Sequence, residues 1–320
     1  MPDQSPEQTP AGRIPVADWL YYRIYPGRLH PGAGARVDAL LVRILRPVLE
    51  RLGTDLPELR WFFLRFADAT GVHVRLRLHA GLPALEHVEH LLDGALVAAR
   101  REAASRSLCS SFSTHLYSPE TQKFGAGRGM HLAEDLFQAS SSMVLGLLAD
   151  DGSTPRVAYA AGHLLDLLRT LPEEQRTGFL HQYAWYWAGG PTGHVTANAV
   201  AYDRAVAVLA RARQVLAAPG TGGTLRRYGT QYRAAMHGVA RRQVPRTDYL
   251  LLFHHIHLTH NRLGVRPATE AALARALWLT LSAGQLGDVD KCHPSGMQKA
   301  RPTGAQRPGT DPRHLLRMKS

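Results

Sequence analysis

Four short apolar runs bounded by turn residues predict β-strands in the first third of the chain. The runs cover residues 18–26 (DWLYYRIYP), 60–68 (RWFFLRFAD), 72–80 (VHVRLRLHA) and 107–118 (SLCSSFSTHLYS). Aromatic and β-branched residues are frequent in them, as is typical of strands. Only Ala69, Thr70 and Gly71 separate the second run from the third, so we expect these two strands to form a hairpin.

Two helices are predicted between the strands, because apolar residues repeat there at intervals of three and four. The first covers residues 35–53 and stops at Gly53, and Pro47 is expected to bend it. The second covers residues 83–105, with one apolar face made of Leu85, Val88, Leu92, Leu96 and Ala99. The resulting order β-α-β-β-α-β is that of the ferredoxin-like split βαβ motif. We therefore predict an α+β fold whose first layer is ferredoxin-like.

The chain becomes mainly helical after a Gly-containing loop at residues 117–130 (YSPETQKFGAGRGM). We expect one domain over residues 16–285, made of an α+β layer at 16–120 and a mainly helical part at 121–285. The polar residues 1–15 and the Pro/Gly-rich, basic residues 286–320 are expected to be disordered tails.

Charge and composition restrict the functional class. The 320 residues carry a net charge of +12, but residues 291–320 alone contain seven basic residues and one acid, a net charge of +6. Direct binding of nucleic acid is therefore not expected. The chain has no apolar run of membrane-spanning length and no signal-peptide pattern, so we expect a cytoplasmic protein with no membrane partner. Its two cysteines give no framework for disulfides or zinc.

The third predicted strand carries basic residues at every other position. On a strand these residues share one face, which consists of His73, Arg75, Arg77 and His79. The alternate positions would pack toward the helices, and they are Val74, Leu76 and Leu78. One interpretation is a polar face exposed to water. The other is an anion site, because guanidinium groups bind a carboxylate or phosphate through two hydrogen bonds.

Histidines cluster in the helix predicted at residues 248–264 (DYLLLFHHIHLTHNRLG). They can be structural, can bind a metal, or can act as acid or base, since imidazole titrates near neutrality. We predict no metal site, because the helix has neither an HExxH spacing nor a nearby acid. His257 and Asn261 lie one turn apart and are expected to present their side chains to the same space. A serine hydrolase is not favoured, since a GxSxG elbow is missing.

Four segments of the chain resemble a known family and follow one another in that family's order. They are DWLYYRIYP, WFFLRFAD with VHVRLRL, YSPETQKFGAG with AEDLFQASS, and HLTHNRLG. The same succession is seen in the small glutamate-elimination domain (SpaB C-terminal-like) of class I lanthipeptide dehydratases, which also exists as free-standing thiopeptide-type bacteriocin biosynthesis proteins. The resemblance spans residues 18–285, which is nearly everything but the two tails.

The resemblance implies a lyase that completes the dehydration of a ribosomal precursor peptide without a cofactor. A separate, tRNA-dependent partner would glutamylate Ser or Thr side chains of the peptide. This chain would then eliminate glutamate and leave dehydroalanine or dehydrobutyrine. In the family, the arginines of the RxR strand bind the leaving group, and they fall here on Arg75 and Arg77. The histidine that takes part in proton transfer falls on His257.

The same motifs imply the substrate-binding residues. The family loop Y-x-x-E-x-x-R-[YF]-G is matched by Tyr117 and Glu120, but Lys123 stands where the family has arginine. Lysine keeps the positive charge and loses the two-pronged hydrogen bonding of a guanidinium group. Asn261 and Arg262 complete the histidine motif H-M-x-x-N-R and would orient that histidine or the helix end.

Two other functions stay open. Thiopeptide pyridine synthases resemble the elimination domain but join two dehydroalanines in a formal [4+2] cycloaddition and expel the leader peptide. The pair Arg75 and Arg77 favours elimination, whereas Lys123 favours the pyridine synthase. The third alternative is a non-catalytic module that binds the precursor peptide at an exposed sheet edge. The sequence also leaves open whether the chain forms a homodimer.

Overall fold

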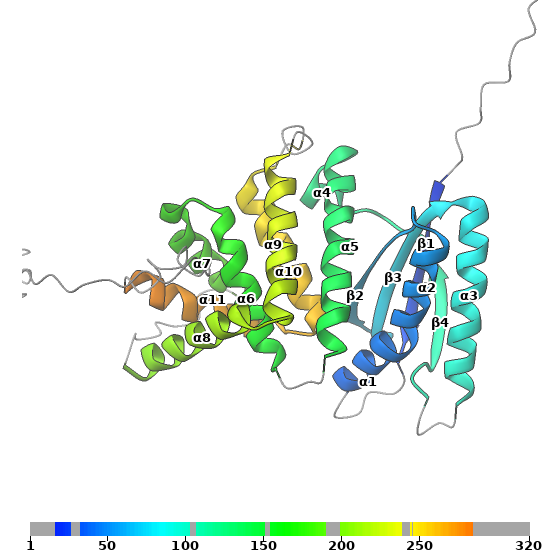
Figure 1. The fold of residues 1–320 in the computed structure, drawn as a ribbon, viewed down its shortest axis with the longest axis horizontal. Helices are drawn as coiled ribbons and strands as arrows, with labels where there is room; N and C mark the ends of the chain where they lie inside the picture. The colour runs from blue at the N-terminus through cyan, green and yellow to red at the C-terminus, as the bar shows by residue number, and fades with distance from the viewer. Residues whose placement is uncertain are drawn as a thin grey trace, which may run out of the picture. The chain divides into compact units, whose positions relative to one another are not determined.

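The computed structural model describes residues 17–26, 33–102, 107–150, 154–189, 199–238, 244 and 246–283 (Figure 1). The two predicted tails lie outside these residues, as does Cys292. The strands are β1 (Ala17–Tyr25), β2 (Arg60–Asp68), β3 (Gly71–Gly81) and β4 (Ser111–His115). The helices are α1 (Ala33–Leu40), α2 (Arg46–Asp55), α3 (Leu82–Arg101), α4 (Thr121–Phe124), α5 (Arg128–Leu148), α6 (Arg156–Leu167), α7 (Glu173–Trp187), α8 (Ala199–Ala217), α9 (Thr221–His237), α10 (Asp248–Leu263) and α11 (Pro267–Ser282), with short π and 3₁₀ turns at Leu41–Leu45 (η1) and Leu168–Thr170 (η2).

The four strands form an antiparallel sheet in the order β2-β3-β1-β4. With helices after β1 and after β3, this is the ferredoxin-like arrangement that the sequence predicts. The predicted hairpin is present, since Asp68 of β2 pairs with Gly71 of β3 and leaves Ala69 and Thr70 in the turn. Gly71 has a φ of 110°, a conformation that favours glycine. The predicted α+β class is confirmed.

The two faces of β3 have the environments that the alternation predicts. Leu76 is fully buried beside Tyr22 of β1, whose hydroxyl donates to Asp93 of α3 at 2.6 Å, so this face is covered by α3. Val74 and Leu78 are also fully buried. The opposite face carries the arginines: Arg75 pairs with Arg23, and Arg77 pairs with Tyr21 on one side and Phe62 on the other. We call this side the basic face.

Two local predictions are wrong. The helix predicted at residues 35–53 is divided into α1 and α2 by the π turn η1, and α2 continues to Asp55 rather than stopping at Gly53. Pro47 is the second residue of α2; it has no N–H for the preceding turn, and a wider turn accommodates its ring. β4 covers only Ser111–His115, because β1 pairs with it over residues 21–25 alone, and Cys109 precedes the strand.

The chain after β4 is helical, as predicted, and runs from α4 to α11. The loop between α4 and α5 depends on two glycines, since Gly125 and Gly127 have φ angles of 87° and 55°. Residues with a Cβ rarely adopt such angles, so these glycines allow the chain to turn from α4 into α5.

Side chains of α5 and α10 close the outer edge of β2. Asn261 accepts a hydrogen bond from the N–H of Arg65 and donates one to its carbonyl oxygen, both at 2.9 Å. Arg262 is 1% exposed and donates from Nε to the carbonyl oxygen of Phe63 at 2.9 Å. The Ser141 hydroxyl accepts from the N–H of Phe63 at 3.2 Å. These bonds satisfy backbone groups that another strand would otherwise pair, and they join α10 to the sheet.

Within the described residues, none of the helices has the length and apolar character needed to cross a bilayer.

We predict that Asn261→Ala lowers the free energy of unfolding by about 1–3 kcal/mol, because the N–H and carbonyl of Arg65 lose their partners. Urea denaturation measures this loss. Arg204→Ala, on the exposed side of α8, is the control and should change the same quantity by less than about 0.5 kcal/mol. If both variants are as stable as the wild type, the predicted contribution of the Asn261 hydrogen bonds to stability is wrong.

A second prediction concerns acid stability. His255 is 2% exposed among the rings of Phe124, Phe137 and Tyr232, and burial lowers its pKa to about 3. Below about pH 6.5 the unfolded chain therefore binds a proton at His255 that the folded chain does not, so acidification favours unfolding. From pH 7 to pH 5 this histidine should cost about 2 kcal/mol of stability. Denaturation at both pH values should show a smaller loss for His255→Leu than for the wild type. Equal losses would contradict the prediction.

Candidate functional site

Arg77 lies in a box of aromatic rings on the basic face. Its guanidinium carbon is 4.8 Å from the ring centre of Tyr21 and 5.2 Å from those of Phe62 and Tyr117. The residue is 7% exposed, and burial lowers its pKa. Within the part of the chain that the structure describes, Nε and Nη1 of Arg77 have no hydrogen-bond partner. Because a buried guanidinium is costly without such a partner, this geometry suits an anionic ligand that can accept hydrogen bonds.

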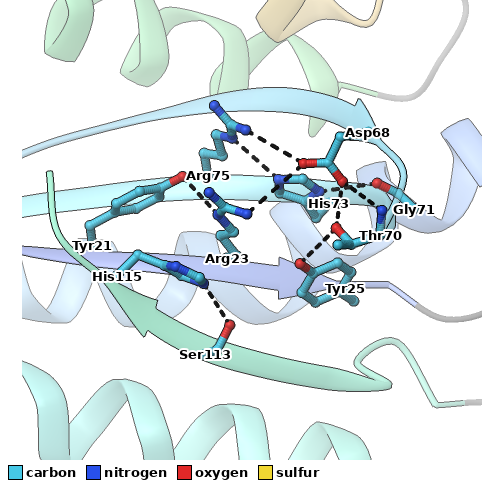
Figure 2. A network of polar contacts seen from close by, with 10 residues as sticks. All are labelled: Tyr21, Arg23, Tyr25, Asp68, Thr70, Gly71, His73, Arg75, Ser113 and His115. Carbon is cyan, nitrogen blue, oxygen red and sulfur yellow. Dashed lines mark hydrogen bonds and ion pairs between the residues drawn. The ribbon is translucent and has the colours of Figure 1, made fainter. Parts of the chain in front are cut away.

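Arg75, the other arginine of the basic face, is engaged by neighbouring side chains (Figure 2). Its Nη2 lies 3.7 Å from Oδ2 of Asp68, and its Nε donates to Nε2 of His73 at 3.2 Å. Nδ1 of His73 therefore carries the ring proton and donates to the carbonyl oxygen of Gly71 at 3.1 Å. Burial lowers the pKa of His73, which favours this neutral form. Arg75 is thus held in place at the hairpin end of the sheet.

Figure 2 also shows that the Asp68 carboxylate forms ion pairs with two arginines. Nη1 of Arg23 lies 3.9 Å from the same carboxylate oxygen that Arg75 approaches. Nearby on β4, burial and the charges of Arg23 and Arg75 lower the pKa of His115. One carboxylate therefore lies among two guanidinium groups, and this part of the basic face favours anions.

Tyr117, one of the rings around Arg77, also contacts two residues that line a cavity of about 210 Å³. Its ring lies 4.6 Å from that of Trp19, and its hydroxyl donates to Oε1 of Glu134 at 3.2 Å. Trp19 and Glu134 both line the cavity. Glu134 is 5% exposed, and burial raises its pKa to about 7. Tyr117 therefore contacts Glu134 through its hydroxyl and Arg77 through its ring.

The loop residues Glu120 and Lys123 form an ion pair at α4. Nζ of Lys123 lies 2.5 Å from Oε2 of Glu120, and both side chains are close to half exposed. Burial lowers the pKa of Arg77, and the charge of Glu120 opposes this shift. Burial and the charge of Lys123 lower the pKa of His254 to about 4, and Glu120 again opposes the shift. The pair therefore acts electrostatically on both Arg77 and the histidine helix α10.

His257 is held by a buried carboxylate and an indole ring. Its Nδ1 lies 3.1 and 3.3 Å from the two carboxylate oxygens of Glu270 on α11. The ring of Trp187 stacks on the imidazole at 3.7 Å between centres with an interplanar angle of 16°. The His257 side chain is 22% exposed, whereas that of Glu270 is fully buried. This arrangement leaves Nε2 as the nitrogen through which His257 can exchange a proton with a ligand.

His257 and Asn261 do not address the same space, so that expectation is wrong. The hydrogen bonds of His257 go to α11, whereas those of Asn261 go to β2. The side chain of Arg262 likewise binds β2 and lies 5.2 Å from the ring centre of Phe137. The geometry favours a role for Asn261 and Arg262 in positioning α10 over direct contact with a substrate.

Glu270, Trp187, Glu134 and Asp68 are site residues that the sequence analysis missed. Asp68 was detectable, because the register of the predicted hairpin places it near the end of β3 that bears His73 and Arg75. Glu270 and Trp187 had no such signal, since they lie on helices separate from α10. Among the described side chains, no three of His, Cys, Asp or Glu come together as a metal ion would require.

Eighteen chains of solved structures are similar to this protein, and three of them show the extent of the likeness. The tRNA-dependent lantibiotic dehydratase MibB from Microbispora sp. 107891 matches with a TM-score of 0.58 and 20% identity over 90% of this chain, which spans 29% of that protein. The pyridine synthase TbtD from thiomuracin biosynthesis matches with a TM-score of 0.57 and 17% identity, covering 86% of this chain and 100% of the other. TsrL matches with a TM-score of 0.56 and 15% identity, covering 88% and 100%. These likenesses establish a shared fold.

Comparison with curated protein sequences gives no match. The family model for the C-terminal part of lantibiotic biosynthesis dehydratases, in contrast, matches residues 19–281. The match includes the basic face, the loop of Glu120 and Lys123, and the helices of His257 and Glu270. The chain therefore belongs to the lantibiotic biosynthesis dehydratase C-terminal family.

Proposed function

We propose that this protein eliminates glutamate from glutamylated Ser or Thr residues of a ribosomal precursor peptide. The observation that carries the proposal is Arg77, a buried guanidinium in an aromatic box whose Nε and Nη1 have no hydrogen-bond partner among the described residues. Glutamate leaves as a carboxylate, and a carboxylate can accept two hydrogen bonds from one guanidinium group. Arg77 is therefore the group we assign to the departing glutamate.

The reaction needs one base and a site for the leaving group. The α-proton of the glutamylated residue moves to Nε2 of His257. The electron pair of that C–H bond forms the Cα=Cβ double bond, and the Cβ–O bond breaks so that glutamate departs with its electron pair. Arg77 stabilises the charge on the departing carboxylate, and Arg75 and Lys123 add positive potential. His257 then returns its proton to the solvent or to the carboxylate, and no cofactor is consumed.

The proposal implies two partners. The substrate is a precursor peptide whose Ser or Thr residues already bear glutamate. The glutamyl groups come from a separate, tRNA-dependent subunit, and the family membership of this chain together with its likeness to a tRNA-dependent dehydratase supports this division. Direct contact between this chain and nucleic acid is not part of the proposal.

A second candidate is the formal [4+2] cycloaddition of a pyridine synthase. It is favoured by Lys123, which replaces the loop arginine of the elimination domains and is paired with Glu120. A point charge paired in this way is a weaker carboxylate clamp than a guanidinium fork. The candidate ranks second because it gives Arg77, whose Nε and Nη1 are without a partner in the described part of the chain, no anion to bind.

We predict that Arg77→Met slows elimination by about 10²–10³-fold, since it removes a preorganised donor of the leaving-group site. Arg77→Lys should recover part of this loss, because it restores the charge without the fork. The purified protein would be incubated with a glutamylated precursor peptide, and the loss of glutamate followed by mass spectrometry. Arg51→Met, on the exposed surface of α2, is the matched control and should eliminate at the wild-type rate.

The same assay separates the two candidates. Full dehydration by Arg77→Met would refute the assignment of Arg77. A wild-type protein that leaves the glutamylated peptide intact, but converts a fully dehydrated azole-containing peptide and releases its leader, would be a pyridine synthase instead.

A further inference from the structure

Glu270 lies in the first turn of α11 and is completely buried, yet it is surrounded by hydrogen-bond donors. Nδ1 of His257 lies 3.1 Å from Oε1, and the hydroxyl of Tyr183 donates to Oε2. Nδ1 of His260 lies 3.4 Å from Oε2. Burial alone would raise the pKa of Glu270, but the hydrogen bond from His257 and the nearby imidazole of His260 outweigh it, and the pKa is lowered. The carboxylate is therefore ionised inside the helical part.

An ionised carboxylate fixes the tautomer of His257. A carboxylate can only accept hydrogen bonds, so Nδ1 of His257 must carry the proton. Nε2 is then left with its lone pair. The ring of Trp187 is stacked on the imidazole and prevents it from rotating about the Cβ–Cγ bond of His257. A base that acts through Nε2 needs this tautomer in a fixed orientation.

A second imidazole, that of His260, lies beside the buried carboxylate. Its Nε2 lies 3.2 Å from the carbonyl oxygen of Ala160, so that nitrogen carries a proton and donates. Its Nδ1 lies 3.4 Å from Oε2 of Glu270 and has no hydrogen-bond partner among the described residues. The other titratable groups near His257 are Tyr183 on α7 and His254 on α10 itself. Neither of these two groups is the hydrogen-bond partner of His257: both carboxylate oxygens of Glu270 lie within hydrogen-bonding distance of its Nδ1.

We propose that Glu270 is the positioning residue of His257: it holds the Nδ1–H tautomer and stabilises the imidazolium that forms when Nε2 takes a proton. The catalytic part of this inference rests on the proposed elimination function. The tautomer itself does not, since it follows from the distances within the folded chain. The two parts can therefore be tested separately.

The first test needs no substrate. Histidine ¹⁵N NMR spectra of the full chain, with His257 assigned by comparison with His257→Gln, should show a protonated Nδ1 and an unprotonated Nε2 in the wild type at neutral pH. In Glu270→Gln this tautomer should lose its dominance, because an amide can also donate to Nδ1. Tyr183→Phe keeps the carboxylate and is the control; it should keep the tautomer. An unprotonated Nδ1 in the wild type would overturn the proposal, even if Glu270→Gln fails to fold.

The second test uses the glutamylated peptide. Glu270→Gln should lower kcat by about 10²–10⁴-fold with little change in KM, since binding groups are untouched and the base is misaligned. If the wild type eliminates glutamate and Glu270→Gln keeps both the rate and the tautomer, the role of Glu270 is refuted while the proposed function stands. If the wild type does not eliminate glutamate but the tautomer depends on Glu270, the proposed function fails and the positioning of His257 by Glu270 stands.

Discussion

The hydrogen bonds between α10 and the outer edge of β2 are the constraint on which the site depends. Arg77 and Arg75 belong to the sheet, whereas His257 belongs to the helical part, and the sequence separates them by about 180 positions. Asn261 and Arg262 bind the backbone of Arg65 and Phe63, one residue on either side of Leu64. Backbone groups cannot rotate away as side chains can, so these bonds fix both the depth and the direction of α10 against β2.

This constraint gives a physical meaning to the spacing of the histidine motif. His257 and Asn261 are four residues apart, which is slightly more than one turn of helix and about 6 Å along its axis. One turn of α10 is anchored to the sheet, and the preceding turn carries His257 and contacts α7 and α11. The anchored turn therefore lies next to the turn that carries His257, the residue proposed to transfer the proton. Because the two turns are adjacent, the position of His257 relative to the sheet can vary little.

The sequence allowed the sheet and its basic face to be predicted because both depend on short-range periodicity. Alternation placed Val74, Leu76 and Leu78 under α3, and the turn at Ala69 and Thr70 set the hairpin. It did not distinguish Arg75 from Arg77, since alternation treats them alike. The difference comes from Asp68 and His73, which hold Arg75, and from rings on β1, β2 and the segment after β4, which surround Arg77. Glu270 was missed for a related reason: its contact with His257 joins two helices whose packing no local pattern records.

Lys123 is paired with Glu120, which affects how the proposed site would bind a carboxylate. The motifs alone would divide this task among Arg75, Arg77 and the loop cation, whereas the contacts point to Arg77. In the family loop this position is an arginine, whose planar fork can bind a carboxylate and still contact a neighbour. Lys123 has one compact charge, and Glu120 approaches it at 2.5 Å. Arg75 is similarly occupied by Asp68. Of the three cations that the proposed reaction assigns to the leaving group, Arg77 alone combines burial with guanidinium nitrogens, Nε and Nη1, that no described residue binds. In that reaction, recognition of the glutamate carboxylate would fall mainly on this side chain.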